Sequence, residues 1–205
     1  MNYLLIHGYE ILSAFIPFLI VFVLCRNMRK RQGIPPDRSA SPVILIFSFY
    51  VIGVYYLTGA GTLYDGFLYQ LEFRPDQLNV VPFSNGMDIT SYFNILLFVP
   101  FGFLIPLIGK QMDRIIPVLG IGFLFTTLIE LSQFLNNRRT DIDDILLNLI
   151  GTVIGFGLYR AIGKHQKHHA SHISFVELSL YILVMFLGRF LLFNEMGIAR
   201  LIYGF

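Results

Sequence analysis

Long hydrophobic runs alternate with short polar links along the whole chain. A helix needs about 20 mostly apolar residues to cross the hydrocarbon core of a bilayer. Six segments meet this requirement: Tyr3–Cys25, Pro42–Leu63, Ser91–Gly109, Ile115–Leu135, Asp143–Ala161 and Ser174–Phe193. The pattern predicts an all-α fold, a polytopic transmembrane helical bundle of about six spans that forms a single membrane domain over residues 1–205.

The composition also indicates a membrane protein. Hydrophobic residues make up 55% of the 205 residues and charged residues only 14%, whereas a soluble domain typically carries about 25% charged residues. A net charge of +2, without a basic patch interleaved with aromatics, argues against a nucleic-acid partner. The single cysteine, Cys25, excludes a disulfide scaffold and is interpreted as a packed apolar side chain.

Lys and Arg are distributed unevenly between the links. The first, third and fifth links hold Arg26, Arg29, Lys30, Arg31, Arg38, Lys110, Arg114, Arg160, Lys164 and Lys167. The opposite side has only Arg74, Arg138, Arg139, Arg189 and Arg200. Cytoplasmic links carry the excess of basic residues, so we expect a multi-pass protein of the cell membrane with both termini outside.

The longest external link, residues 64–90, is too apolar for a freely solvated loop. We expect it to lie on the outer bilayer surface or to fold back over the helices. Pro75 and Pro82 argue against one continuous helix there.

Polar residues gather near the outer ends of the middle spans. An ionisable side chain inside a span costs about 2.5–3.5 kcal/mol on insertion scales, so it needs a partner, water or a function. In the fourth span Glu130 and Gln133 share one helical face, and Arg138 follows in a short link where we expect it to neutralise part of the acidic patch. The fifth span carries a stripe at spacings of three and four residues: Asp141, Asp144, Asn148, Gly151 and Gly155.

A short connection makes the fourth and fifth spans antiparallel neighbours, which places their polar residues at a similar depth. Asn94 of the third span lies at the same level. The predicted binding site therefore comprises Asn94, Glu130, Gln133, Arg138, Asp141, Asp144 and Asn148, with Glu130 and Asp144 as candidate catalytic carboxylates. Two simpler roles stay open: the acids from Asp141 to Asp144 as an N-cap and first turn, and Asn94 as an interhelical hydrogen-bonding residue.

Gly151 and Gly155 form a small-xxx-small motif, which favours helix packing. We expect them to hold the polar end of the stripe against the fourth-span helix.

Glu10 and Arg189 are interpreted as a structural ion pair between the first and last spans. No metal or cofactor site is predicted, because the stretch His165, His168, His169 and His172 is interpreted as a solvated cytoplasmic loop.

Several of these residues occur in a familiar order: Asn94-x5-Pro100-Phe-Gly102, Glu130-x2-Gln133, and Arg138-x2-Asp141-x2-Asp144-x3-Asn148-x2-Gly151-x3-Gly155. Over about residues 45–160 the chain resembles the VanZ-like membrane protein family, and we call this segment the VanZ-like core. Within it, Asn79-Val-Val-Pro-Phe83 resembles that family's Asn-Leu-Ile-Pro-Phe element. The founding member is associated with resistance to teicoplanin-type glycopeptide antibiotics, which act on cell-wall precursors at the outer membrane face. The resemblance thus implies a bacterial cell-envelope protein whose partners are membrane lipid and either a lipid-linked cell-wall precursor or a glycopeptide antibiotic.

Three functional hypotheses follow. The first is a VanZ-like protein that lowers glycopeptide susceptibility through an outer-face polar site for envelope lipid or antibiotic. The second is an intramembrane enzyme that acts on a lipid-linked precursor with Glu130 and Asp144 as acid and base; it lacks a Gly-x-Ser-x-Gly elbow and a His-x-x-x-His pair, although carboxylates suit a hard cation such as Mg²⁺. The third, a transporter, is least favoured because the spans show no repeat.

Overall fold

The structure, a computed structural model, describes residues 2–34, 40–69, 78–84, 86, 88–136, 138, 140–162 and 173–204. The helices are α1 (Asn2–Arg31), α2 (Ala40–Thr58), α3 (Leu63–Leu68), α4 (Ile89–Ile108), α5 (Ile115–Gln133), α6 (Ile142–Ile162), α7 (Phe175–Leu192) and α8 (Glu195–Tyr203). Short 3₁₀ turns cover Lys110–Met112 and Phe134–Asn136, and two short strands are β1 (Leu78–Asn79) and β2 (Thr140–Asp141).

The predicted helical bundle is confirmed. Within the described ranges six helical segments are long and apolar enough to cross a membrane, and they correspond to the six predicted spans. Helix α1 continues past the predicted end at Cys25 to Arg31. The sequence-based prediction lacked the two short helices, α3 and α8, because neither has the length that a span requires.

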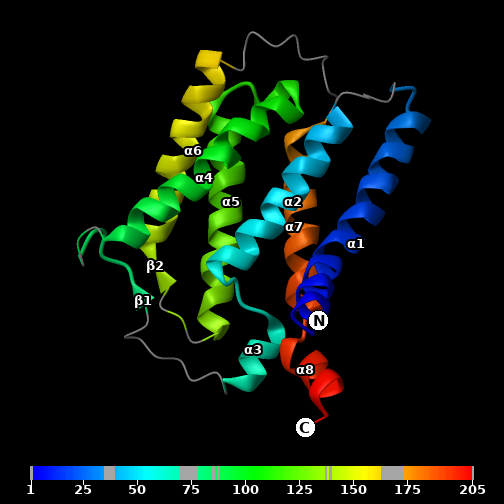
Figure 1. The fold of residues 1–205 in the computed structure, drawn as a ribbon. Helices are drawn as coiled ribbons and strands as arrows, with labels where there is room; N and C mark the ends of the chain where they lie inside the picture. Colours follow the sequence, from blue (N-terminus) through cyan, green and yellow to red (C-terminus); the bar gives the residue numbers. More distant parts are fainter. Residues whose placement is uncertain are drawn as a thin grey trace.

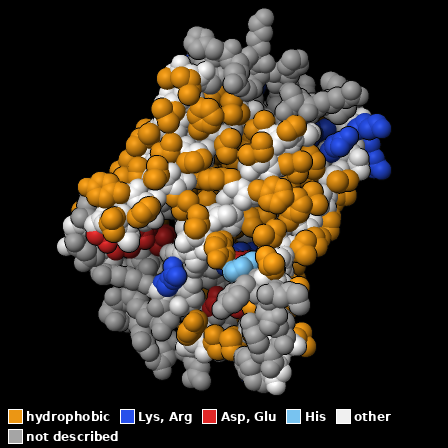
Figure 2. All heavy atoms as spheres, in the orientation of Figure 1, with side chains coloured by type: hydrophobic (Ala, Val, Ile, Leu, Met, Phe, Trp, Pro, Cys, Tyr) orange, Lys and Arg blue, Asp and Glu red, His pale blue; other side chains and the backbone are white. Residues whose placement is uncertain are grey.

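Both termini lie at one end of the bundle (Figure 1), together with α3, α8, β1 and β2. We call this the α3–α8 end, and the other end the basic end. In Figure 2 the visible face is largely hydrophobic, with Lys and Arg at the basic end of α1 and acidic side chains near the start of α4. A belt of apolar side chains between two polar ends is what a bilayer-spanning bundle presents.

The closest helix packing is between α4 and α6, which run in the same direction (Figure 1). A Cβ atom on Gly151 would lie 2.1 Å from the Ile95 carbonyl oxygen, and one on Gly155 would lie 2.0 Å from that of Val99. Gly102 of α4 meets α6 in the same way, at the Thr152 carbonyl. The expectation that these glycines face the fourth-span helix, α5, is therefore wrong: they bring the backbones of α4 and α6 into contact.

A buried ion pair joins the first and last long helices, as the sequence suggested. Arg189 of α7 approaches the Glu10 carboxylate of α1 at 2.8 Å from Nη2 and 2.9 Å from Nε. The same guanidinium donates to the carbonyl oxygens of Ala60 and Gly61, at the start of the segment that leads to α3. This arginine therefore fixes α1, α7 and the end of α2 to one another.

Part of the long link folds back over the helices, as one of the two expectations stated. Strand β1 pairs in parallel with β2, with Leu78 opposite Thr140 and Asn79 opposite Asp141. Near the start of the link, Thr62 and Asp65 form a capping box that starts α3. Pro75 lies outside the described residues. The strand pair carries the residues before α4 to the start of α6, where the polar side chains gather.

Candidate polar site at the α3–α8 end

The site begins with a contact between two parallel helices. The Asn94 side-chain amide of α4 donates to Asp144 Oδ1 in the first turn of α6. Both side chains are partly buried. An amide that meets a carboxylate forms a charge-assisted hydrogen bond, which is stronger than a neutral one. The bond therefore fixes one oxygen of Asp144 at the end of the contact between α4 and α6, which we call the α4–α6 seam.

Glu130 of α5 adds a second carboxylate from a third helix. Its side chain is only 2% exposed. Oε2 accepts a hydrogen bond from the Asp141 backbone N–H at 3.3 Å, and the charges of Asp144 and Asp141 both act on this carboxylate. The structure thus brings α4, α5 and the start of α6 together around a group of acidic side chains.

Strand β1 supplies a residue to which the sequence analysis gave no role. The Asn79 amide donates to both carboxylate oxygens of Asp141, at 2.9 and 3.0 Å. Its own oxygen accepts from the Ser84 hydroxyl and from the Val81 N–H. Asn79 therefore holds Asp141 on one side and the turn after β1 on the other. The available signal was its place in the motif that resembles the VanZ-like family.

Asp143 was also missed as a structural contact. It is buried, and its Oδ1 accepts the Phe83 backbone N–H at 2.7 Å. Phe83 has φ of 56°, in the left-handed region that non-glycine residues seldom adopt. This contact fixes the turn before α4 against the first turn of α6.

Asp141 itself is not part of the helical stripe that the spacing predicted. It lies in β2, and α6 begins at Ile142. Its Oδ1 accepts the Asp143 N–H at 3.0 Å, which is the geometry of an N-cap. The simpler interpretation of this acid as a helix cap therefore describes its contact with α6, while the Asn79 amide donates to both of its oxygens.

Gln133 and Arg138 turn away from the acids. Gln133 Nε2 and Arg138 Nη1 both donate to the Thr58 carbonyl oxygen, at 2.8 and 2.9 Å. The expectation that Arg138 neutralises the acidic patch is not met, since its guanidinium packs on Gly59 and makes no ion pair with a described carboxylate. These two residues instead hold the last carbonyl of α2, which a helix end leaves without a partner. Arg139 lies outside the described residues.

Asn148 forms a deeper polar layer, one turn further into the bundle. It is 2% exposed, and its Nδ2 donates to the Thr126 hydroxyl of α5 at 2.8 Å. Its Oδ1 has no hydrogen-bond partner within the described part of the chain. The Thr152 hydroxyl continues this layer by donating to the Asn148 carbonyl oxygen.

Asp88 marks the solvent side of the site. Its carboxylate accepts the Ser91 N–H and caps α4. Hydrogen bonds from the Thr90 hydroxyl, the Ser91 N–H and the Ser91 hydroxyl lower the pKa of Asp88 to about 2. Asp88 is therefore negatively charged at any physiological pH, and its charge acts on the Asp144 carboxyl group.

The described residues contain no cluster of three His, Cys, Asp or Glu side chains arranged to hold a metal ion. The stretch His165 to His172 lies outside those residues. What the arrangement offers is a set of acceptor oxygens on rigid helix ends, suited to hydrogen-bonding a ligand that carries N–H or O–H donors.

In the described part of the chain, six helices of spanning length, with a group of acidic and amide side chains at one end, define an integral membrane protein. The VanZ/LLP1 family model matches residues 47–163, and the chain belongs to this family. It is similar to Protein VanZ of Enterococcus faecium, with 28% identity over 118 residues that cover 56% of this chain and 73% of that protein. No solved structure matches.

Proposed function

We propose that this chain is a VanZ-like protein of the bacterial cell membrane that binds the polar part of an envelope lipid or of a glycopeptide antibiotic. Binding at the α3–α8 end lowers susceptibility to teicoplanin-type antibiotics. The observation that carries the proposal is the convergence of Asn94, Glu130 and Asp144 from three helices at one end of the bundle. The resemblance to VanZ supplies the class of ligand.

The charge of the site favours a ligand with amine or amide donors. Glu130, Asp141, Asp143 and Asp144 lie within one group, and Arg138 bonds elsewhere. A peptide-bearing lipid precursor and a peptide antibiotic both offer such donors. Hydrogen bonds to charged acceptors contribute about 1.5–3 kcal/mol each, so two or three of them suffice for selective binding.

The charge distribution supports an outward-facing site. The described Lys and Arg residues toward the basic end are Arg26, Arg29, Lys30, Arg31, Lys110, Arg114 and Arg160. By the positive-inside rule this end faces the cytoplasm. The acidic site then faces the compartment where lipid-linked wall precursors meet glycopeptides.

Antibiotic susceptibility tests the proposal directly. We expect Glu130→Gln and Asp144→Asn each to remove the protection that the wild-type chain gives a susceptible bacterial host. Asp113→Asn is the matched control, because Asp113 lies at the basic end in a half-exposed pair with Arg160. Unchanged protection by both site variants, at equal membrane levels, would refute the proposed site.

A second function, an enzyme that acts on a lipid-linked precursor, is favoured by the burial of Glu130 next to Asp144. A buried carboxylate beside another is a recurrent arrangement for proton transfer. Incubation of the purified protein with a labelled lipid-linked precursor tests it. A product that requires Glu130 but not Asp113 supports catalysis, and the absence of any product rejects it.

A further inference from the structure

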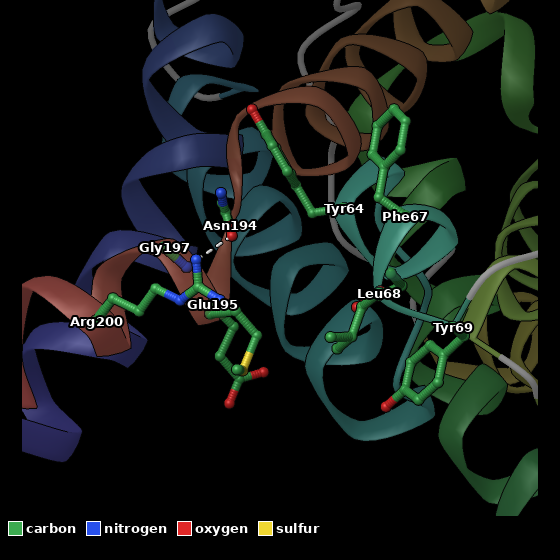
Figure 3. Close-up of a pocket in the computed structure, with 10 residues that line it drawn as sticks. Tyr64, Phe67, Leu68, Tyr69, Asn194, Glu195, Gly197 and Arg200 are labelled. Carbon is green, nitrogen blue, oxygen red and sulfur yellow. Dashed lines mark hydrogen bonds between the residues drawn. The ribbon is translucent and has the colours of Figure 1, made fainter. Parts of the chain in front are cut away.

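A pocket of about 450 Å³ lies between the short helices α3 and α8 (Figure 3). Its lining includes Tyr64, Asp65 and Tyr69 from the α3 side, and Asn194, Glu195 and Arg200 from the α8 side. It shares no residue with the polar site, so the inference does not rest on the proposed function.

The pocket lies close to where two spans end. Helix α8 begins three residues after α7 ends, and α3 begins five residues after α2 ends. Helix α8 is amphipathic, with Asn194 capping its start by accepting the Gly197 N–H at 2.8 Å. Short amphipathic helices beside a span lie in the interface between lipid and water.

Exposed apolar side chains on both short helices agree with this position. Leu201 of α8 is 84% exposed and Phe67 of α3 is 73% exposed. Tyr64 and Tyr69 add aromatic rings with polar tips, which are enriched at the level of lipid head groups. The rim of the pocket is therefore suited to contact with lipid rather than with water alone.

The charged residues in the pocket have both signs. Arg200 extends toward the Asn194–Gly197 segment (Figure 3) and makes no ion pair with a described residue. Glu195 is exposed at the start of α8, and Asp65 lies across the pocket on α3, where one carboxylate oxygen accepts the Thr62 N–H. A guanidinium without an ion pair among the described residues, in one pocket with two acids, complements a group that carries one phosphate and one amine.

We propose that this pocket binds the head group of a zwitterionic aminophospholipid, a phosphoethanolamine, from the surrounding bilayer. Arg200 binds the phosphate, since a guanidinium matches phosphate oxygens in a bidentate manner. Glu195 and Asp65 receive the ammonium group. The acyl chains run along the apolar rim of α3 and α8. A purely anionic head group fits less well, because the same two acids repel it.

Native mass spectrometry of the purified full chain tests this assignment. The protein is exposed to equimolar phosphatidylethanolamine and phosphatidylglycerol with identical acyl chains, and the bound adducts are counted. We expect one phosphatidylethanolamine adduct, favoured over phosphatidylglycerol by about tenfold, the effect of one charge-assisted hydrogen bond. Equal retention of the two lipids would overturn the proposal.

Two variants test which pocket residue binds the phosphate and which binds the ammonium group. Arg200→Gln should reduce the phosphatidylethanolamine adduct by about tenfold, whereas Glu195→Gln should keep an adduct but lose the preference over phosphatidylglycerol. Arg114→Gln is the matched control, because Arg114 is exposed at the basic end. An Arg200→Gln protein that folds and retains the lipid as well as wild type would also overturn the proposal.

Discussion

Asn94 and Asp144 are joined by a hydrogen bond across two parallel helices, at the point where the α4–α6 seam opens toward the α3–α8 end. The seam is tight because glycines allow backbone contact below it. Asp144 Oδ1 is thereby fixed, and Oδ2 makes no hydrogen bond with any described residue. The site thus combines a rigid support with an acceptor oxygen that a ligand can use.

A double-mutant cycle measures this bond. Asn94→Ala and Asp144→Ala, alone and together, should give a coupling energy of about 1 kcal/mol or more in the free energy of unfolding. The measurement is reversible unfolding of the purified protein in detergent. Additive effects of the two substitutions would show that the bond contributes nothing to stability.

Gly151→Ala should destabilise the bundle by separating α4 from α6. The added methyl group would lie 2.1 Å from the Ile95 carbonyl oxygen, so the backbones must move apart. Overpacking of this kind typically costs about 1–3 kcal/mol. Gly157→Ala, on the same helix with nothing within 4 Å of the new Cβ atom, is the control. Thermal unfolding of the two variants should differ clearly, and equal melting temperatures would contradict the packing described.

Arg189→Gln should be the most destabilising of these changes. It leaves the buried Glu10 carboxylate without its main partner and removes donors from the Ala60 and Gly61 carbonyls. Breaking a buried pair by removing one partner costs about 3–5 kcal/mol. Arg160→Gln removes a half-exposed pair with Asp113 and should cost about 1 kcal/mol or less. Similar losses in the two variants would refute the structural role of the buried pair.

Thiol labelling tests the orientation of the bundle. In a Cys25→Ser background, which has no other cysteine, we introduce Val80→Cys at the α3–α8 end and Lys110→Cys at the basic end; both positions are exposed. A membrane-impermeant reagent applied to intact cells should label the first and not the second. The opposite pattern would place the acidic site in the cytosol and remove the basis for an antibiotic-binding role.

The sequence was sufficient to predict the six spanning helices, because a run of about 20 apolar residues leaves few alternatives in a bilayer. It did not predict which helices meet. Gly151 and Gly155 were correctly read as contact residues, but no pattern in a single chain says that the partner is α4 rather than the adjacent α5. Helix α8 was not predicted, because a helix of nine residues is too short to cross a membrane and leaves no long apolar run in the sequence.

Within the site, the residue types allowed us to predict which side chains gather, but not which partner each one contacts. Asn94, Glu130, Asp141 and Asp144 do lie together. Arg138 was expected to neutralise them on charge alone, yet its guanidinium donates to the Thr58 carbonyl oxygen at the end of α2 instead. Asn79 and Asp143 were missed as contacts because both depend on the segment around β1: Asn79 lies in β1, and Asp143 accepts the N–H of Phe83 shortly after it. A strand of two residues leaves no periodic signal in a sequence.

The parallel pairing of β1 with β2 has a consequence for the order of assembly. Asn79 is synthesised 62 residues before Asp141, its hydrogen-bonding partner. Domains generally form from the N-terminus during synthesis, so the Asn79 segment waits unpaired while α4 and α5 are made and inserted. The acidic group is complete only once α6 has been made, so a chain stopped after α5 would lack it.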